Sequence, residues 1–336
     1  MKMLNRNKFL FVMMAVFAFI FSSCEKKEQP IELPKGNDSI QLESVSLGAN
    51  YDKQIFVNLE TKQTTVIENN SWDLYFDSSP QGFMIYMNGG KGVLVAKTNS
   101  INFTDCSITT NYKWQWDAAD GLTDSVVLSN WCNKTSLSTN DSVYIIDRGA
   151  SITDPSRFMQ FKIVSVNATK YVLQIADING GNMHYFTVLK DPLKTNVYLS
   201  FDNGGTYLNF EPNKNNWQVC FLRYRWVYYQ FNPPLLYTVT GAYLNTANYE
   251  AAVDSSMKFE NITYNNSMPL QYNSNRDAVG FDWKVYNFTT GRYTARNYVN
   301  YILRPKTPGK LFKFRFIDYY DEMGLKGTPK FEVQGM

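Results

Sequence analysis

Apolar and polar residues alternate with a period of two in several stretches of the chain. The clearest examples are KQIFVNLE, DSVYIID, MQFKIVSV, KYVLQIAD and KLFKFRFID, at residues 53–60, 141–147, 159–166, 170–177 and 310–318. Successive side chains of a strand point to opposite faces of a sheet, so this alternation predicts strands with one buried face. We find no amphipathic helix of three turns. The pattern therefore predicts an all-β fold of multi-stranded antiparallel sheets.

Short runs of Asn, Asp and Gly separate these stretches. They occur at residues 88–90 (NGG), 179–181 (NGG) and 202–205 (DNGG). All three residue types tolerate the positive φ angles of tight turns. The segment between the last two runs is predicted to form two strands joined around Asp191-Pro192.

Two finer predictions follow from strand geometry. Trp72 and Phe76 stand at alternate positions, so both rings are expected on one face of a strand. Pro329 begins the last strand-like stretch. Because proline has no N–H to donate, that strand is expected at the edge of a sheet.

The first 24 residues have the pattern of a bacterial lipoprotein signal. Residues 1–8 carry three basic groups and no acid, and residues 9–21 are apolar without a break. This apolar run is shorter than the roughly 20 residues that span a bilayer, so the segment is predicted to be a secretory signal. The small pair Ser22-Ser23 before Cys24 resembles a lipobox, in which the cysteine is lipidated and becomes the new N-terminus. The alternative is an ordinary secretion signal with an incidental cysteine.

Residues 24–40 are charged, contain two prolines and show no period, which predicts a lipidated cysteine with a flexible tether. Removal of residues 1–23 lowers the 33 basic residues to 30, equal to the 30 acidic ones, so the charge of +3 belongs to the signal. No Lys/Arg cluster follows the tether, and we expect no nucleic-acid partner. The protein is expected to attach to the membrane through its lipid anchor, as an outer-membrane lipoprotein at the cell surface.

Three cysteines follow Cys24. In an oxidising compartment Cys106 and Cys132 are candidates for a disulfide bond. Cys220 lies in the apolar run VCFL and is expected to be a small buried residue. The sequence contains no C-x-x-C motif, so it does not indicate a thiolate zinc site.

Residues 41–336 are predicted to form a single β domain, because no linker-like stretch divides them. The domain contains a weak internal echo. SWDLYF at residues 71–76 is similar to NWQVCF at residues 216–221. In each, a Trp follows a polar turn and leads into an aromatic-rich strand. We interpret the echo as two similar strands of one layered fold.

Three groups of sequence segments occur in the same order, and with similar residues, in a known family. They are YDKQIFVNLETKQ and NNSWDLYFDSS, then VGFDWKVYNFTTGRYT, then GKLFKFRFIDYYDEMGLKGTPKFEVQ, at residues 51–63, 69–79, 279–294 and 309–334. Together they resemble the HmuY-type haemophore family, lipoproteins of the Bacteroidetes. The resemblance implies a HmuY-like sandwich of β-sheets. It also implies non-catalytic capture of haem or a related porphyrin, with handover to a TonB-dependent outer-membrane receptor.

A haem site needs axial ligands, which are commonly His or Met. The chain has one histidine, His184, so a pair of histidines within one chain cannot hold the iron. The candidate haem or metal ligands are therefore His184 and the methionines Met183, Met257 and Met268. The alternatives are a surface histidine and methionines that fill gaps in a core.

The run RYRWVYY at residues 223–229 combines basic and aromatic side chains. Alternation places Arg223 and Arg225 on one face of a strand and Tyr224, Trp226 and Tyr228 on the other. The aromatic face is a candidate for stacking on a planar ligand or a sugar ring, and the arginines are candidates for pairing with carboxylates. The alternative is that these rings belong to the core.

The sequence offers little sign of a catalytic site. The sequence contains no G-x-S-x-G, no H-E-x-x-H and no glycine-rich phosphate loop. We therefore predict a binding protein and not an enzyme. Two functions compete: haem capture, which the family resemblance implies, and a HmuY-like fold without haem that binds a glycan, a peptide or a partner protein.

Overall fold

The computed structural model describes residues 40–106, 112–133, 135–151 and 153–336. Within these residues twenty strands form four antiparallel sheets and one two-stranded ribbon, which confirms the all-β prediction. No helix of the described residues is long and apolar enough to cross a membrane. The predicted signal, Cys24 and all of the tether except Ile40 lie outside the described residues.

Helices in the described residues are short. The single α-helix is α2 (Tyr264–Ser267). The 3-10 helices are Phe103–Asp105, Thr123–Ser125, Val127–Ser129, Asp202–Gly204, Lys214–Asn216 and Phe259–Asn261.

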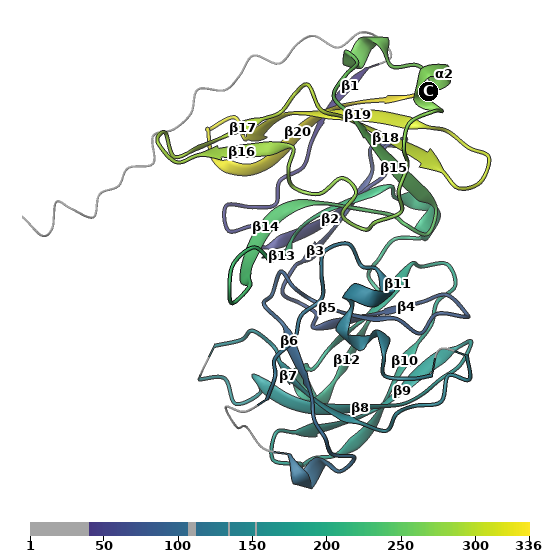
Figure 1. Cartoon of the computed structure of the whole chain (residues 1–336), viewed down its shortest axis with the longest axis vertical. Helices are drawn as coiled ribbons and strands as arrows, with labels where there is room; N and C mark the ends of the chain where they lie inside the picture. The colour runs from purple at the N-terminus through teal and green to yellow at the C-terminus, as the bar shows by residue number, and fades with distance from the viewer. Residues whose placement is uncertain (1–39, 107–111, 134, 152) are drawn as a thin grey trace, which may run out of the picture.

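Two sheets and the ribbon form the upper half of the molecule in Figure 1, which we call the first unit. One sheet contains, in spatial order, β1 (Gln41–Ser44), β20 (Lys326–Gly335), β19 (Phe312–Tyr320), β18 (Asn300–Pro305) and β15 (Tyr249–Asp254). The other contains β14 (Leu235–Leu244), β13 (Val219–Tyr228), β2 (Lys53–Val57) and β3 (Thr64–Glu68). The ribbon consists of β16 (Lys284–Asn287) and β17 (Arg292–Ala295).

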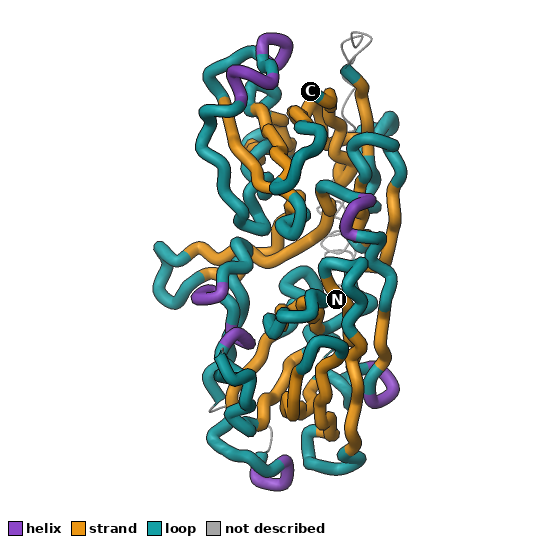
Figure 2. The backbone as a smooth tube through the Cα atoms, turned by 90° about the vertical axis from the view of Figure 1, so that its right-hand side faces the viewer, coloured by secondary structure: helices purple, strands orange, loops and turns teal. Residues whose placement is uncertain are grey.

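The lower half, which we call the second unit, also has two sheets. The sheet nearer the first unit contains β12 (Thr206–Leu208), β11 (Asn196–Ser200), β4 (Leu74–Asp77) and β5 (Ile85–Met87). The other contains β10 (His184–Leu189), β9 (Lys170–Asp177), β8 (Phe158–Val166), β7 (Val143–Asp147) and β6 (Leu94–Lys97). Figure 2 shows the two strand-rich halves stacked along the long axis.

Two separate segments of the chain form the first unit. The chain leaves this unit after β3, builds the whole second unit, and returns to the first unit as β13. The early strand β2 therefore pairs with the late strand β13, with Phe56 opposite Cys220 (Figure 1).

Each unit has its own apolar core. In the first unit Trp283 stacks on Phe316 with ring centroids 3.9 Å apart, and Phe221 and Phe331 pack beside them. The core of the second unit lies between its two sheets and includes Phe76, which has no exposed surface. The single domain at 41–336 stays a prediction, since the packing itself is organised around two cores.

Two strand predictions need correction. Trp72 and Phe76 do not share a face: Phe76 lies in the core of the second unit, whereas Trp72 packs on Tyr75 outside it. A bend at Asp73, before β4 begins, resets the alternation. Pro329 lies in β20, which is an inner strand between β1 and β19. Proline is tolerated there because the pairing of β19 with β20 is irregular nearby, between Asp318 and Tyr320.

The turn around Asp191-Pro192 does join two strands, β10 and β11, as predicted. The two strands belong to different sheets of the second unit. The turn therefore carries the chain from one layer to the other and does not close a hairpin.

The predicted disulfide between Cys106 and Cys132 is absent. Cys106 packs in a small cluster with Phe103 and Val143. Cys132 packs in the main core of the second unit with Trp131. The two thiols are buried in separate apolar clusters, and this keeps them apart. Cys220 is buried, as predicted.

Candidate functional site

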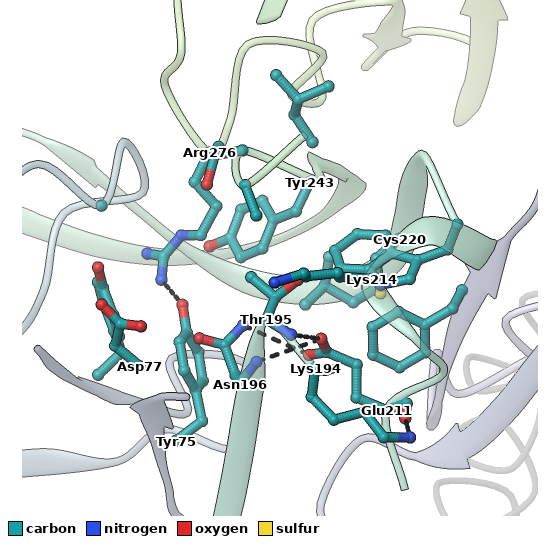
Figure 3. Close-up of a pocket in the computed structure, with 18 of the residues that line it drawn as sticks. Tyr75, Asp77, Lys194, Thr195, Asn196, Glu211, Lys214, Cys220, Tyr243 and Arg276 are labelled. Carbon is teal, nitrogen blue, oxygen red and sulfur yellow. Dashed lines mark hydrogen bonds between the residues drawn. The ribbon is translucent and has the colours of Figure 1, made fainter. Parts of the chain in front are cut away.

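A cavity of about 340 Å³ lies between the β14–β13–β2–β3 sheet of the first unit and the β12–β11–β4–β5 sheet of the second (Figure 3). Its walls combine aromatic rings with charged and amide side chains. They include Phe56, Trp72, Tyr75, Asp77, Tyr86, Asp120, Lys194, Asn196, Tyr198, Glu211, Lys214, Trp217, Tyr243 and Arg276. The size is typical of sites for small molecules.

Strand alternation explains why the cavity forms here. In β2, Ile55 and Val57 point into the first core, so Gln54 and Phe56 point out of it, into the cavity wall. The same division holds in β13, β4 and β11. Their core-facing pairs are Val219 and Phe221, Leu74 and Phe76, and Val197 and Leu199. Their cavity-facing pairs are Cys220 and Leu222, Tyr75 and Asp77, and Asn196 and Tyr198.

The aromatic part of the wall is a set of mutually packed rings. Tyr75 stacks on Tyr86 with centroids 4.6 Å apart, and Trp72 meets Tyr198 edge-on at 5.2 Å. On the opposite sheet Phe56 meets Trp217 edge-on at 5.0 Å. These contacts fix the orientation of each ring, so the wall is preorganised for a ligand.

Arg276 holds the two units together at one end of the cavity. Its guanidinium donates hydrogen bonds to the Tyr75 hydroxyl and, over 3.2 Å and 3.1 Å, to the carbonyl oxygens of Ala119 and Ala118. It also lies 4.5 Å from the ring centroid of Tyr243 and 5.2 Å from that of Tyr86. No salt bridge joins it to a carboxylate of the described residues, so rings and carbonyls stabilise this charge.

Glu211 lies at the other end of the cavity and is 1% exposed. Its carboxylate accepts hydrogen bonds from the backbone N–H groups of Thr195 and Asn196, at 2.7 Å and 3.2 Å, and from the Tyr198 hydroxyl at 2.9 Å. Lys194 donates to its backbone carbonyl (Figure 3). Burial nevertheless raises the pKa of Glu211 to about 7, because desolvation outweighs these bonds.

The two tryptophans of the internal echo both line this cavity, one on each sheet. The Trp72 indole N–H donates to the side-chain oxygen of Gln54 over 3.1 Å. The Trp217 indole N–H is buried and has no acceptor among the described residues. An unpaired buried donor in a cavity wall is a position where a ligand atom gains a hydrogen bond.

His184, the first predicted haem ligand, begins β10 on the surface of the second unit. Both of its ring nitrogens are engaged: Nδ1 lies 2.8 Å from the Asn182 carbonyl oxygen, and Nε2 lies 2.7 Å from that of Gly204. Binding of iron would require one of these bonds to break. Met183 is the preceding residue and is exposed, 54% of its surface being accessible.

The other two predicted ligands lie elsewhere. Met257 packs against an apolar cluster of the first unit that contains Ile302. Met268 is the exposed C-cap of α2, at the top of the first unit in Figure 1. The structure therefore does not bring His184, Met183, Met257 and Met268 to one place, and they do not fit a shared haem. Within the described residues, no three His, Cys, Asp or Glu side chains form a metal-binding group.

The run of five predicted stacking residues is divided. Tyr224 and Trp226 line a second cavity, described below. Tyr228 packs on Tyr237 near the tip of the β13–β14 hairpin. The side chains of the two arginines donate hydrogen bonds to other segments of the chain. Arg223 donates to the Asn70 side chain and the Asn50 carbonyl oxygen, and Arg225 donates to the Val93 carbonyl oxygen.

Arg276 and Glu211 are the main residues that sequence reasoning missed. Neither belongs to a recognisable motif, and each gains its meaning from partners on distant segments. The echo of Trp72 and Trp217 was the available signal, because a Trp repeated after a polar turn marks both walls of the cavity.

No protein-family model matches the sequence, and no curated protein matches it. Among solved structures, apo PinO from Porphyromonas gingivalis is similar, with 10% sequence identity and a TM-score of 0.37 over 89% of this chain and 98% of the PinO chain. A TM-score of this size does not establish a common fold. The resemblance to the HmuY-type family stays a prediction, and the function is inferred below from this chain's own residues.

Proposed function

We propose that this protein is a non-catalytic binding protein, anchored by lipid at the outer membrane, whose cavity between the two units takes a neutral saccharide. Of the two functions predicted from the sequence, the geometry supports the one without haem. The predicted iron ligands are scattered, and none of the described residues that line the cavity is a His or a Met. Cys220 and four tyrosines line it. Burial raises the pKa of that thiol and of the tyrosine hydroxyls, Tyr75 and Tyr198 among them, so none of them is the thiolate or phenolate that would bind iron.

The observation that carries the proposal is the balance of the cavity wall. Three cationic side chains (Lys194, Lys214 and Arg276) face three acidic ones (Asp77, Asp120 and Glu211). Because burial raises the pKa of Glu211 to about 7, the wall carries at most a fraction of one excess positive charge at neutral pH, and this favours a neutral ligand that offers many donors and acceptors. Sugars combine such hydroxyl groups with apolar ring faces, and the packed tyrosines and tryptophans supply surfaces for those faces.

The unpaired Trp217 indole N–H adds a specific contact. A hydroxyl or ring oxygen of a sugar would accept this hydrogen bond and remove the energetic cost of leaving it unmade, about 1–3 kcal/mol. The Asn196 side-chain amide also lines the cavity and presents both a donor and an acceptor.

The test compares glycans with haemin on the full chain. Glycan-array screening, followed by calorimetry with each positive glycan, should give saturable binding. Haemin, oxidised and reduced, should give no saturable shift of the Soret band. A saturable Soret shift, or the absence of binding to every glycan, would contradict the proposal.

A pair of matched variants locates the site. Tyr86→Ala removes a ring that lines the cavity and should weaken glycan binding by at least about tenfold, which is 1.4 kcal/mol. Tyr185→Ala removes a ring that is 67% exposed on β10, outside the cavity, and should leave binding unchanged. Equal effects of the two variants would place the glycan elsewhere.

A further inference from the structure

A second cavity, of about 280 Å³, lies in the first unit beside β13. Tyr224 and Trp226 form one wall, and the loop 277–282 forms another. Residues beyond the end of β15 and after β17 complete it, including Ser255 and Arg296. No described residue lines both this cavity and the one between the units.

The apolar wall is a platform of rings. Trp226 meets Phe281 edge-on with centroids 5.2 Å apart, and both are only partly buried. Tyr301 and Val299 extend this surface. Exposed faces of Trp and Phe attract apolar groups and organic cations.

The charged groups of this cavity form no salt bridges with other described residues. Asp277, Asp282 and Arg296 line it, and no salt bridge joins any of them to another described residue. Arg276, next to Asp277 in the sequence, donates instead to Tyr75 and the Ala118 carbonyl oxygen at the other cavity. Two carboxylates and one guanidinium therefore line the cavity itself, while Arg276 and Lys284 act on Asp277 and Asp282 from outside its lining.

A buried polar atom gives an independent sign of a ligand. The Tyr224 side chain is 2% exposed, and its hydroxyl has no hydrogen-bond partner among the described residues. This hydroxyl lies near Gly280, which also lines the cavity: a Cβ built on that glycine would be 3.9 Å from it. Asp277 and Asp282 lie near enough to add to the rise of its pKa, which burial dominates. Native structures seldom leave such a group unsatisfied.

We propose that this second cavity binds a primary amine attached to an apolar or aromatic group. The ammonium group lies between Asp277 and Asp282 and donates its third hydrogen bond to the Tyr224 hydroxyl. The apolar part packs on Trp226 and Phe281. Arg296 adds a contact for ligands that also carry a carboxylate, so free aromatic amino acids fit this site.

The test is calorimetry on the full chain with three compounds of one shape: phenethylamine, L-phenylalanine and 3-phenylpropionate. Both amines should bind, L-phenylalanine the tighter, and 3-phenylpropionate should not. The proposal fails if neither amine binds, or if 3-phenylpropionate binds as tightly as phenethylamine.

Variants separate this site from a non-specific one. Asp282→Asn changes an exposed residue and should weaken phenethylamine by at least about tenfold. Tyr224→Phe removes one hydroxyl and should weaken it by about threefold or more. Asp124→Asn, an exposed acid of the second unit, is the matched control and should change nothing. Equal loss in Asp282→Asn and Asp124→Asn would overturn the assignment.

The cavity between the units provides the last control. Tyr86→Ala, which is expected to weaken glycan binding, should leave phenethylamine binding intact. If glycan binding alone fails, the proposed function is contradicted and the amine site is not. Loss of amine binding in Tyr86→Ala would mean that the amine occupies the first cavity, and would overturn the proposal.

Discussion

Lys284 allows a direct test of how burial of a charged group affects the stability of this fold. It begins β16 within the VGFDWKVYNF stretch and is 8% exposed. Its ammonium group donates to the Thr240 carbonyl oxygen and lies 4.3 Å from the ring centroid of Trp283 and 4.9 Å from that of Tyr319. No carboxylate of the described residues forms a salt bridge with it. Burial lowers its pKa from 10.5 to about 7.

This shift predicts how stability depends on pH. Between pH 7 and 10.5 the unfolded chain holds a proton on Lys284 that the folded protein has lost, so the free energy of unfolding rises with pH. The full difference corresponds to about 5 kcal/mol. Contacts with the rings favour the ammonium form by about 1–2 kcal/mol and reduce this value. With this reduction we expect a gain of about 2 kcal/mol between pH 7 and pH 9.5.

The assay is urea unfolding followed by tryptophan fluorescence at pH 7, 8, 9 and 9.5, below the ordinary pKa of tyrosine at about 10. Lys284→Met keeps the volume and removes the ionisable group. It should be more stable than the wild type at pH 7, and the two free energies should converge as the pH rises. Lys258→Met, at an exposed lysine of the same unit, should keep the wild-type slope. Parallel slopes for the wild type and Lys284→Met would refute the reasoning.

Three further outcomes are expected. Burial raises the pKa of Glu211 from 4.5 to about 7, so the folded protein holds an extra proton between these pH values and its free energy of unfolding falls as the pH rises through them. Glu211→Gln should remove this loss of about 3 kcal/mol. The melting temperatures of variant and wild type should therefore converge at low pH. Asp73 accepts from Arg148 at 2.9 Å with 0% of its own surface exposed, so Asp73→Ala should cost about 3–5 kcal/mol in chemical denaturation, and a loss below about 1 kcal/mol would count against a buried ion pair. Because no disulfide joins Cys106 to Cys132, a reducing agent should leave the melting temperature unchanged, whereas a clear decrease would show that the bond exists in the protein.

The strands of this protein could be predicted from alternation, because side-chain direction along a strand is a local property. Residues 170–177 were predicted as a strand and form β9 at those same bounds. The alternation also placed Arg223 and Tyr224 on opposite faces of β13, and they do have separate partners. Local bends escape this pattern. The bend at Asp73 put Trp72 and Phe76 on different sides, although their spacing is that of one face.

The candidate sites depend on contacts between distant segments. Arg276 meets Tyr75 across 201 positions of the sequence, and the Leu59 N–H meets Gln218 across 159. No short motif encodes such a pair, because the partners share no local geometry. The methionines and His184 show the converse. Their side-chain chemistry suited a haem, but the fold placed Met183 and His184 in the second unit and Met257 and Met268 in the first.

The sequence by itself determined the class of fold and the positions of the strands with clear alternation, such as β2, β8 and β9, since these follow from a period of two and from turn residues. Only the tertiary structure decided that the chain leaves the first unit after β3 and returns with β13. That path sets two outward faces against each other, and the rings left over from two cores become the walls of a cavity. Alternation along a strand sets the direction in which a side chain points, but the packing of sheets against each other decides which residues that side chain contacts.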